Sequence, residues 1–324
     1  MKSRIARIIV HPWFDYAALV AAIVVLVGFF SWRNEHFFSA ETAAAIAQQK
    51  SDLLVVSVGM TLVLLVGEID LSVGSVAALS GAVLGWLLVD GGLPLGAAVG
   101  GALLVGTGCG LCNGFVTVHW KLPSFIVTLG MFEVARGAAY LITGSQTKYL
   151  GSQLELLGMS IPGTDLSVMF LSAVGLVVAG ELILRGTVFG RHLFAIGSNE
   201  TAARLSGIHP GRLRLIVFGI SGMLAGLGGV FQTAHLSMAD PNAGTGMGLA
   251  AIAAVVIGGT SLNGGRGSVV GAFLGLAIVA ILQTGLTQMS ASDPVKRIVT
   301  GVVIVSAVIG DVYRRRLSER GARQ

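Results

Sequence analysis

The chain has 324 residues, of which 54% are hydrophobic and only 11% are charged, and its mean hydropathy is +0.83. Soluble globular domains carry about 25% charged residues, so this composition excludes a soluble enzyme and indicates a lipid-facing surface. The net charge of +5 comes mainly from basic residues in three segments beside hydrophobic stretches: 1–7, 185–214 and 313–324. That distribution is typical of membrane topology, and we expect no nucleic-acid partner.

Ten hydrophobic stretches are long enough to span a bilayer, or are shorter and can be enclosed by other helices. In chain order they are 15–32, 51–66, 71–89, 94–118, 124–143, 167–184, 215–234, 248–262, 268–289 and 295–312. The sequence therefore predicts an all-α integral membrane protein, with a single polytopic transmembrane domain over residues 1–324 and about ten transmembrane helices. Because six spans precede the basic 185–214 loop and four follow it, both termini and this loop are expected in the cytoplasm.

Glycine is abundant, with 47 residues against 7 prolines, and its spacing indicates helix packing. Helices in lipid associate by close backbone approach at small residues. Three such faces are expected, and they comprise Gly106, Gly110 and Gly114; Gly222 and Gly226; Gly271 and Gly275. The two cysteines, Cys109 and Cys112, lie inside one hydrophobic stretch, where packing against a helix face is favoured over a redox or metal pair.

Two of the spans, 53–66 and 248–262, are short, and each runs into a polar loop that contains glycine. The loop GEIDLSVGS at 67–75 is similar to GGTSLNG at 258–264, which is followed after two further residues by GSV at 267–269. This predicts an internal repeat, and chance similarity among small residues is the alternative. Paired short segments interrupted by glycine point to a translocation site in transporters. The predicted pathway residues are Glu68, Asp70, Ser72, Ser75, Asn113, Ser124, Thr128, Thr260, Ser261 and Asn263.

Few ionisable residues lie within the spans. Glu133 and Arg136 share a helix face, and they could pair as a structural bridge or line a solute path. A charge at the bilayer centre costs about 2.5–3.5 kcal/mol on insertion scales, so such residues are rarely without purpose. Glu68 and Asp70 follow the first short span, where they could contact solute hydroxyls, and Asp70 could instead cap a helix that begins at Leu71.

Catalytic and cofactor motifs are missing from the sequence. It contains no Gly-Lys dipeptide and therefore no phosphate-binding loop, and it lacks the H-E-x-x-H, G-x-S-x-G and G-x-G-x-x-G patterns. The six histidines are scattered without metal-ligand spacing. We expect no catalytic residue, no cofactor and no metal site.

The loop at 185–214 predicts a short, capped helix. Ser198 or Asn199 is suited to the N-cap, Ala202–Leu205 to the helix and Gly207 to its end. A capped helix in the longest cytoplasmic loop suggests a docking element for a soluble partner. The residues predicted to take part are Asn199, Glu200, Ala202, Ala203, Arg204, Leu205 and Gly207.

Four ordered sequence blocks resemble the ribose/xylose-type permease subunits of bacterial ABC sugar importers. They are GMTLV at 59–63 with GEIDLSVGS at 67–75, PSFIVTLG at 123–130 with Arg136-Gly137, AIGSNETAARLSGI at 195–208, and IGGTSLNGGRGS at 257–268. The resemblance covers essentially the whole chain.

The resemblance implies a permease of the bacterial inner membrane that moves a monosaccharide or a similar small polar solute into the cytoplasm. It further implies a homodimer or a heterodimer with a similar permease, a cytoplasmic ABC ATPase as the source of energy, a periplasmic solute-binding protein, and a coupling role for the 199–207 helix. The repeat alone also allows a stand-alone secondary transporter. Family members usually carry an acidic pair near the second short span, where this chain has Gly248 and Ala250, so the solute stays open.

Overall fold

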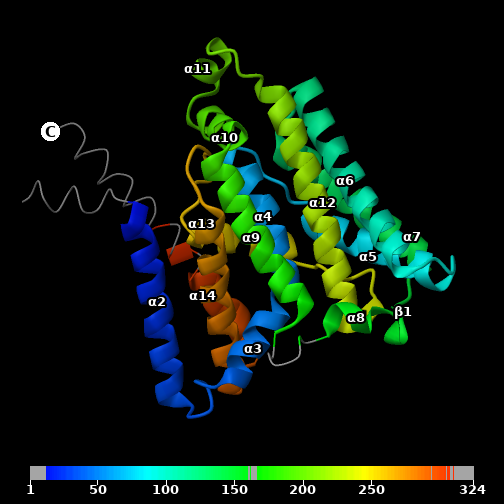
Figure 1. Ribbon diagram of the computed structural model, residues 1–324, viewed down its shortest axis with the longest axis vertical. Helices are drawn as coiled ribbons and strands as arrows, with labels where there is room; N and C mark the ends of the chain where they lie inside the picture. Colours follow the sequence, from blue (N-terminus) through cyan, green and yellow to red (C-terminus); the bar gives the residue numbers. More distant parts are fainter. Residues whose placement is uncertain are drawn as a thin grey trace, which may run out of the picture.

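The computed structural model describes residues 12–159, 161, 166–292, 294–303, 305, 306 and 309. The basic residues at 1–7 and the tail 313–324 lie outside the described residues. Most of the described chain is helical, and the helices lie roughly side by side in one bundle (Figure 1). The labelled helices of ten or more residues are α2 (Pro12–Arg33), α3 (Ala40–Gln49), α4 (Ser51–Leu65), α5 (Val73–Val89), α6 (Leu95–Trp120), α7 (Ser124–Thr143), α9 (Val168–Gly186), α10 (Val188–Ser198), α12 (Pro210–Leu236), α13 (Met247–Ile257) and α14 (Val269–Gln288).

The remaining elements are short. They comprise the helices η1 (Gly151–Leu154), α8 (Glu155–Gly158) and α11 (Glu200–Leu205) and the strands β1 (Lys148–Tyr149) and β2 (Met238–Ala239). The strands pair antiparallel, with Lys148 opposite Ala239 and Tyr149 opposite Met238. Residues 294–303 are also helical. Figure 1 shows α11 projecting beyond one end of the bundle, which is called the α11 end below.

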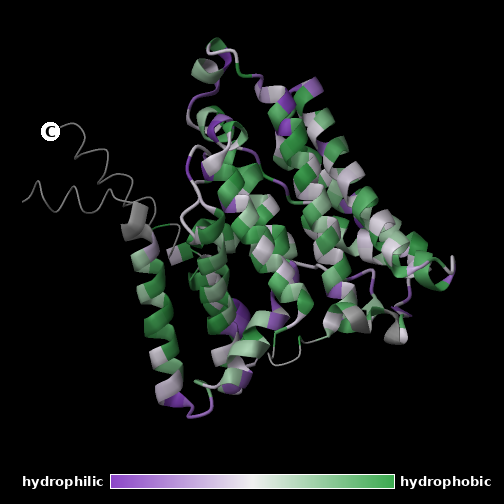
Figure 2. Cartoon of the chain, in the orientation of Figure 1, coloured by the Kyte–Doolittle hydropathy of each residue, from purple (hydrophilic) through white to green (hydrophobic). Residues whose placement is uncertain are grey.

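The predicted membrane class is confirmed. Among the described residues, six helices (α2, α6, α7, α9, α12 and α14) are long and apolar enough to cross a bilayer, and α4, α5 and α13 are shorter apolar helices. Each of these nine coincides with a predicted stretch, and the tenth stretch begins with the helix at 294–303. Figure 2 shows hydrophobic residues along the helices and hydrophilic ones mainly in the connections. The short helices α3 and α10 fall in segments that the sequence indicated to be loops.

The contact between α6 and α12 depends on glycine, as the spacing predicted. A Cβ placed on Gly110 would lie 2.1 Å from the carbonyl oxygen of Phe218, and one on Gly106 would lie 2.4 Å from that of Gly222. Gly275 meets the backbone of α13 equally closely, with its Cβ position 2.1 Å from the carbonyl oxygen of Ala254. Such distances leave no room for any side chain, so these helices pack backbone against backbone.

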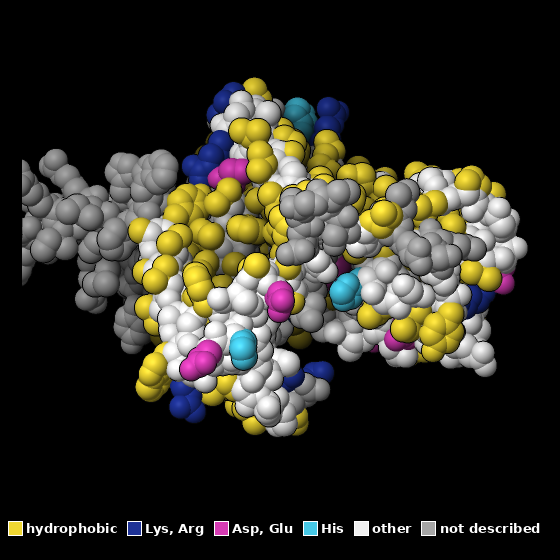
Figure 3. Space-filling view, turned by 60° about the horizontal axis from the view of Figure 1, so that its bottom comes forward, with side chains coloured by type: hydrophobic (Ala, Val, Ile, Leu, Met, Phe, Trp, Pro, Cys, Tyr) yellow, Lys and Arg dark blue, Asp and Glu magenta, His cyan; other side chains and the backbone are white. Residues whose placement is uncertain are grey.

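The centre of the bundle is α4, in which all residues from Leu53 to Leu65 are buried. It packs against α9, α12, α13 and α14, while α5 packs against α6, α7 and α12. Helix α2 packs against α14 at one edge, and α7 lies at the opposite edge (Figure 1). A cavity of about 540 Å³, with an almost wholly apolar lining, lies between α2, α3 and α14. Figure 3 shows hydrophobic side chains gathered around a hollow, beside polar groups on the same face.

The α6–α12 contact gives the first prediction. Gly110→Leu is expected to destabilise the protein by about 1–3 kcal/mol or more, because the new side chain must displace the backbone of α12. The matched control is Gly108→Leu on the same helix, since Gly108 is exposed and has nothing within 4 Å of its Cβ position. Thermal stability in detergent, followed by size-exclusion chromatography, measures both. Equal losses for the two variants would contradict the packing argument.

Candidate functional site

Helices α4 and α13 end at the α11 end of the molecule with the same hydrogen-bonding pattern. After α4, the amides of Gly67 and Glu68 donate to the carbonyls of Leu64 and Val63, at 3.0 and 3.1 Å. After α13, Gly259 and Thr260 donate to Val256 and Val255 at 2.9 and 3.1 Å. Both patterns are Schellman motifs, which need a left-handed residue, and Gly67 and Gly259 supply it with φ of +77° and +90°. The two short helices therefore stop for the same reason.

The loops that follow these helices also share a turn. The Asp70 carboxylate accepts from the amide of Ser72 at 3.0 Å, and the Ser261 hydroxyl accepts from the amide of Asn263 at 3.3 Å. The loops meet directly, because the amide of Gly265 donates to the carbonyl of Leu65 at 2.9 Å. The C-terminal ends of α4 and α13 thus lie together, and the two helices run in the same direction.

Asp70 is the centre of a buried polar cluster. Its side chain is 1% exposed, and its carboxylate accepts from the Ser72 hydroxyl at 2.6 Å and from the Ser221 hydroxyl at 3.3 Å. The Asn113 amide donates to the Ser72 hydroxyl at 3.0 Å. The expectation that Asp70 caps a helix from Leu71 is wrong, because α5 begins at Val73 and Asp70 forms a turn ahead of it.

Ser124 and Thr128, both in the first two turns of α7, satisfy the backbone of the same loop. The Ser124 hydroxyl accepts from the amide of Ile69 at 3.0 Å, and the Thr128 hydroxyl accepts from the amide of Leu71 at 3.1 Å. Backbone amides outside a helix cannot be left unpaired in an apolar interior. These hydroxyls therefore replace the hydrogen bonds that the interruption of the helix removes.

The other predicted pathway residues differ in exposure. Ser75 and Thr260 are buried, and their hydroxyls have no partner among the described residues. Asn263 is exposed at the α11 end, and Glu68 is partly buried there. The structure thus brings Asp70, Ser72, Asn113, Ser124 and Thr128 into one enclosed cluster, while Glu68 and Asn263 lie at its rim.

Glu68 begins a chain of ion pairs that reaches α11. Its carboxylate lies 2.7 Å from Nε of Arg214 at the start of α12, and Arg214 also contacts Glu200 at 2.8 Å. Glu200 in turn pairs with Arg204 at 2.8 Å. Glu68, Arg214, Glu200 and Arg204, named the ion chain below, line one cavity of about 1020 Å³. Arg214 is not among the predicted site residues, because it lies fourteen residues from Glu200 and on another helix.

The charges within the ion chain reinforce one another at Glu200. Burial tends to raise the pKa of the Glu200 carboxyl, but hydrogen bonds from Arg214 and Arg204 outweigh it and hold the pKa below its ordinary value. The ion pairs of Glu200 with Arg214 and Arg204 therefore stabilise the folded protein fully above the ordinary glutamate pKa. This stabilisation is lost only as the pH falls through the lowered pKa of Glu200. Near neutral pH the contacts between Glu200 and the two arginines remain charged.

Helix α11 confirms the predicted caps. The Asn199 side chain accepts from the amide of Ala202 at 3.0 Å, and Gly207 ends the helix with φ of +84°. Ala203 is 4% exposed and faces the protein, whereas Leu205 is 86% exposed. Ala202 and Arg204 are exposed as well. The helix therefore presents Ala202, Arg204 and Leu205 outward, while Asn199, Glu200, Ala203 and Gly207 shape it and attach it.

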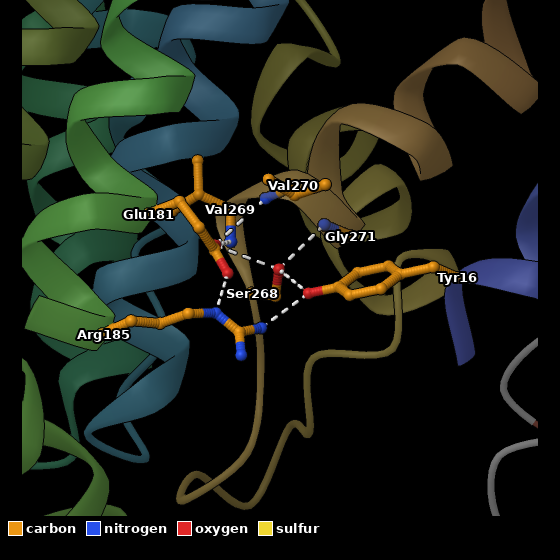
Figure 4. Close-up of polar contacts among 7 residues, drawn as sticks. All are labelled: Tyr16, Glu181, Arg185, Ser268, Val269, Val270 and Gly271. Atoms are coloured by element: carbon orange, nitrogen blue, oxygen red, sulfur yellow. Dashed lines mark hydrogen bonds and ion pairs between the residues drawn. The ribbon is translucent and has the colours of Figure 1, made fainter. Parts of the chain in front are cut away.

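A second polar cluster, not foreseen from the sequence, connects α9, α14 and α2 (Figure 4). The Glu181 carboxylate accepts from the amides of Val269 and Val270, at 2.8 and 3.2 Å, and so caps the first turn of α14. The Tyr16 hydroxyl donates to Ser268 and accepts from Arg185, each at 2.7 Å. Glu181 is separated from Val269 by 88 residues, so no local pattern could indicate that it caps α14.

Glu133 and Arg136 do not form the predicted pair. Arg136 donates to the backbone carbonyls of Pro241 and Ala243 and so attaches α7 to the loop before α13. Glu133 is exposed, and within the described part of the chain it makes no hydrogen bond or ion pair. Their spacing placed them on one face, but the nearby carbonyls take up the guanidinium.

Gly248 is one of the two positions at which this chain lacks the acidic pair usual in the family that it resembles. It packs against the first loop, which follows α4. A Cβ there would lie 3.2 Å from the carbonyl oxygen of Leu71, which is closer than ordinary contact. Ala250, two residues later, is partly buried. A side chain at position 248 would therefore crowd the backbone of the first loop in this chain.

The family model described as branched-chain amino acid transport system, permease component, matches residues 42–308. The chain is 38% identical to the ribose import permease protein RbsC of Escherichia coli K12 over 94% of this chain and 96% of that protein. It is 35% identical to the L-arabinose ABC transporter permease protein AraH of Azospirillum brasilense, over 80% and 76% of the two chains. It is 32% identical to the fructose import permease protein FrcC of Rhizobium meliloti, over 93% and 86%. No solved structure matches the chain.

The buried cluster generates a second prediction. Asp70→Leu removes the acceptor for the Ser72 amide and hydroxyl and for Ser221, and each buried group left unpaired costs about 1–3 kcal/mol. Asp70→Asn keeps one acceptor oxygen, so its thermal midpoint in detergent should fall much less. Ser221→Ala, which removes only the 3.3 Å contact, should lie nearest to the wild type. If Asp70→Leu matched the wild type in stability, Asp70 would be free to serve the solute instead of the fold.

Proposed function

The chain belongs to the family of transport-system permease components that matches it over residues 42–308, and from this premise we propose that it is the membrane subunit of an ABC importer for a monosaccharide. In this proposal the solute arrives from a periplasmic binding protein, and a separate cytoplasmic ATPase supplies the energy. Two copies of the chain, or one copy and a similar permease, enclose the path. The named relatives transport ribose, L-arabinose and fructose, which supports a sugar of this size.

The observation that carries the proposal is the way α11 is held. A helix of six residues projects from the bundle with an exposed leucine at its tip. Its base is nevertheless fixed by two caps and by the ion chain. A short helix that merely connected two spans would not need such attachment, whereas a helix that receives force from a partner does.

The loops after α4 and after α13 both contact the segment that contains α10 and α11. The ion chain joins α11 to Glu68 in the first loop. At the end of α10, a Cβ on Gly197 would lie 2.0 Å from the carbonyl of Leu65 and 2.2 Å from the amide of Gly265. Movement of the segment 188–205 would therefore displace the loops after α4 and after α13 together. We propose that this is how ATP hydrolysis in the partner reaches the path.

The proposed topology has ten spans, both termini in the cytoplasm and α11 on the cytoplasmic side, within the bacterial inner membrane. The basic 185–214 loop supports this orientation. The shared Schellman motifs and turns after α4 and α13 support an internal repeat. Two copies of one motif run in the same direction here, with their ends in contact.

Within the predicted pathway set, the hydrogen bonds favour two different roles. We propose that Asp70, Ser72, Asn113, Ser124 and Thr128 hold the first loop in place, because their polar atoms are buried and mostly paired. Glu68 and Asn263, at the rim, are the members suited to meet solute or water near the cytoplasmic exit. Ser75, Thr260 and Ser261 are buried.

The coupling assignment gives a third prediction. Leu205→Asp should abolish sugar-stimulated ATP hydrolysis by the assembled transporter, because it places a charge on the apolar tip of α11. Arg214→Glu should have a similar effect, since it breaks the ion chain and repels Glu68 and Glu200. The control Leu93→Asp changes an exposed leucine in the connection between α5 and α6, away from the α11 end, and should leave hydrolysis unchanged. Wild-type stimulation in both α11-end variants would show that coupling takes another route.

A fourth prediction separates an importer subunit from a secondary transporter. Reconstituted alone in liposomes, the chain should accumulate no D-ribose, L-arabinose or D-fructose under a proton or sodium gradient, because it has no phosphate-binding loop and depends on a partner for energy. Uptake should appear only after the ATPase and binding protein are added with ATP. Gradient-driven accumulation by the chain alone would overturn the importer assignment.

A further inference from the structure

The outer face of α7 carries a carboxylate that lipid cannot accommodate well. Glu133 is the tenth of the twenty residues of α7 and is exposed. Among the described helices, it is the exposed charged side chain that lies farthest from a helix end. Because α7 is about 30 Å long, this position falls near the middle of the hydrocarbon layer. Charged groups at that depth face water or protein and not lipid.

The neighbours of Glu133 on α7 leave space beside it. Gly130 and Gly137, one turn before and one turn after, are exposed and have nothing within 4 Å of their Cβ positions. Two turns beyond Glu133 on the same face, the Tyr140 hydroxyl donates to the Asn242 side chain at 2.5 Å in an exposed contact. A strip of polar groups and bare backbone therefore runs for about 10 Å, from mid-helix to the end opposite α11.

The rest of the helix is fixed, so the strip is held in position. Arg136 attaches α7 to the carbonyls of Pro241 and Ala243, and Ser124 and Thr128 attach its other end to the first loop. The Arg136 guanidinium is thereby directed to the backbone carbonyls. The Glu133 carboxylate keeps its acceptor sites available to a partner outside this chain.

We propose, resting on the importer function above, that this strip of α7 lines the solute path between two permease subunits, and that Glu133 accepts hydrogen bonds from the hydroxyl groups of the sugar there. Two copies related by a two-fold axis present the same surface to each other, so their Glu133 carboxylates face across the axis. Like charges repel in a dry contact, and a water-filled path between them removes that cost. A carboxylate offers two acceptor oxygens to a polyhydroxylated solute, and Tyr140 adds an aromatic face near the entrance.

The experiment places single cysteines in a background that lacks Cys109 and Cys112. Glu133→Cys and the matched control Val134→Cys are examined in membranes that contain the assembled transporter, since Val134 is adjacent on α7 and 66% exposed. A small water-soluble methanethiosulfonate reagent should modify the E133C thiol at least tenfold faster than the V134C thiol. A short bismaleimide should join two E133C subunits and leave V134C subunits separate. An E133C thiol as inert as that of V134C, or one that reacts but is never joined to a second copy, would overturn the proposal.

Uptake supplies a readout that folding alone would not change. With whichever of D-ribose, L-arabinose and D-fructose the wild-type transporter accumulates, Glu133→Leu should lower uptake at least tenfold at unchanged protein level. Glu133→Gln, which still bonds hydroxyls, should recover most of it. Wild-type uptake by Glu133→Leu would overturn the role of Glu133 while leaving the importer function intact. Failure of the wild-type transporter to import any of the three with ATP would instead count against the proposed function, and the thiol labelling would still decide the position of the strip.

Discussion

The interruption of the backbone between α4 and α5 is the constraint on which the rest of the structure depends. Between Ile69 and Ser72, backbone amides have no helical partner in a largely buried part of an apolar bundle, where an unpaired polar group is costly. Asp70 satisfies the amide of Ser72, and Ser124 and Thr128 satisfy those of Ile69 and Leu71. Because two of these partners come from α7, the interruption determines where the N-terminal half of α7 lies.

The glycine contact between α6 and α12 serves the same loop. Asn113 precedes Gly114 on α6, and Ser221 precedes Gly222 on α12, so the residues that bring the two backbones together adjoin those that bond the loop. With larger side chains at Gly110 or Gly222, the two helices would separate and Asn113 and Ser221 would no longer reach the Ser72–Asp70 pair. The hydrogen bonds of the buried polar groups therefore depend on the close packing of α6 against α12.

In the proposed importer, the α11 end is where a soluble partner would act on this buried arrangement. Charged contacts join α11 to the first loop through Arg214, and close backbone contacts join α10 to both loops through Gly197. Helix α9 leads directly into α10 and, through Glu181, also caps the first turn of α14. The segment 188–205 is therefore in contact with the loops after α4 and α13 and with α12, and α9 connects it to α14.

The sequence by itself determined the membrane class, the positions of nine apolar helices, the glycine faces and the caps of α11, because each depends on composition or on residues a few positions apart. It also indicated that Asp70, Ser72, Asn113, Ser124 and Thr128 belong to one region, although not that they bond a loop. Only the tertiary structure decided the contacts of Glu68 with Arg214, of Glu181 with Ser268 and of Arg136 with Pro241, since these partners lie from 87 to more than a hundred residues away. Spacing along one helix suggested that Glu133 meets Arg136, but carbonyls from a distant loop compete for the guanidinium, and no local pattern contains them.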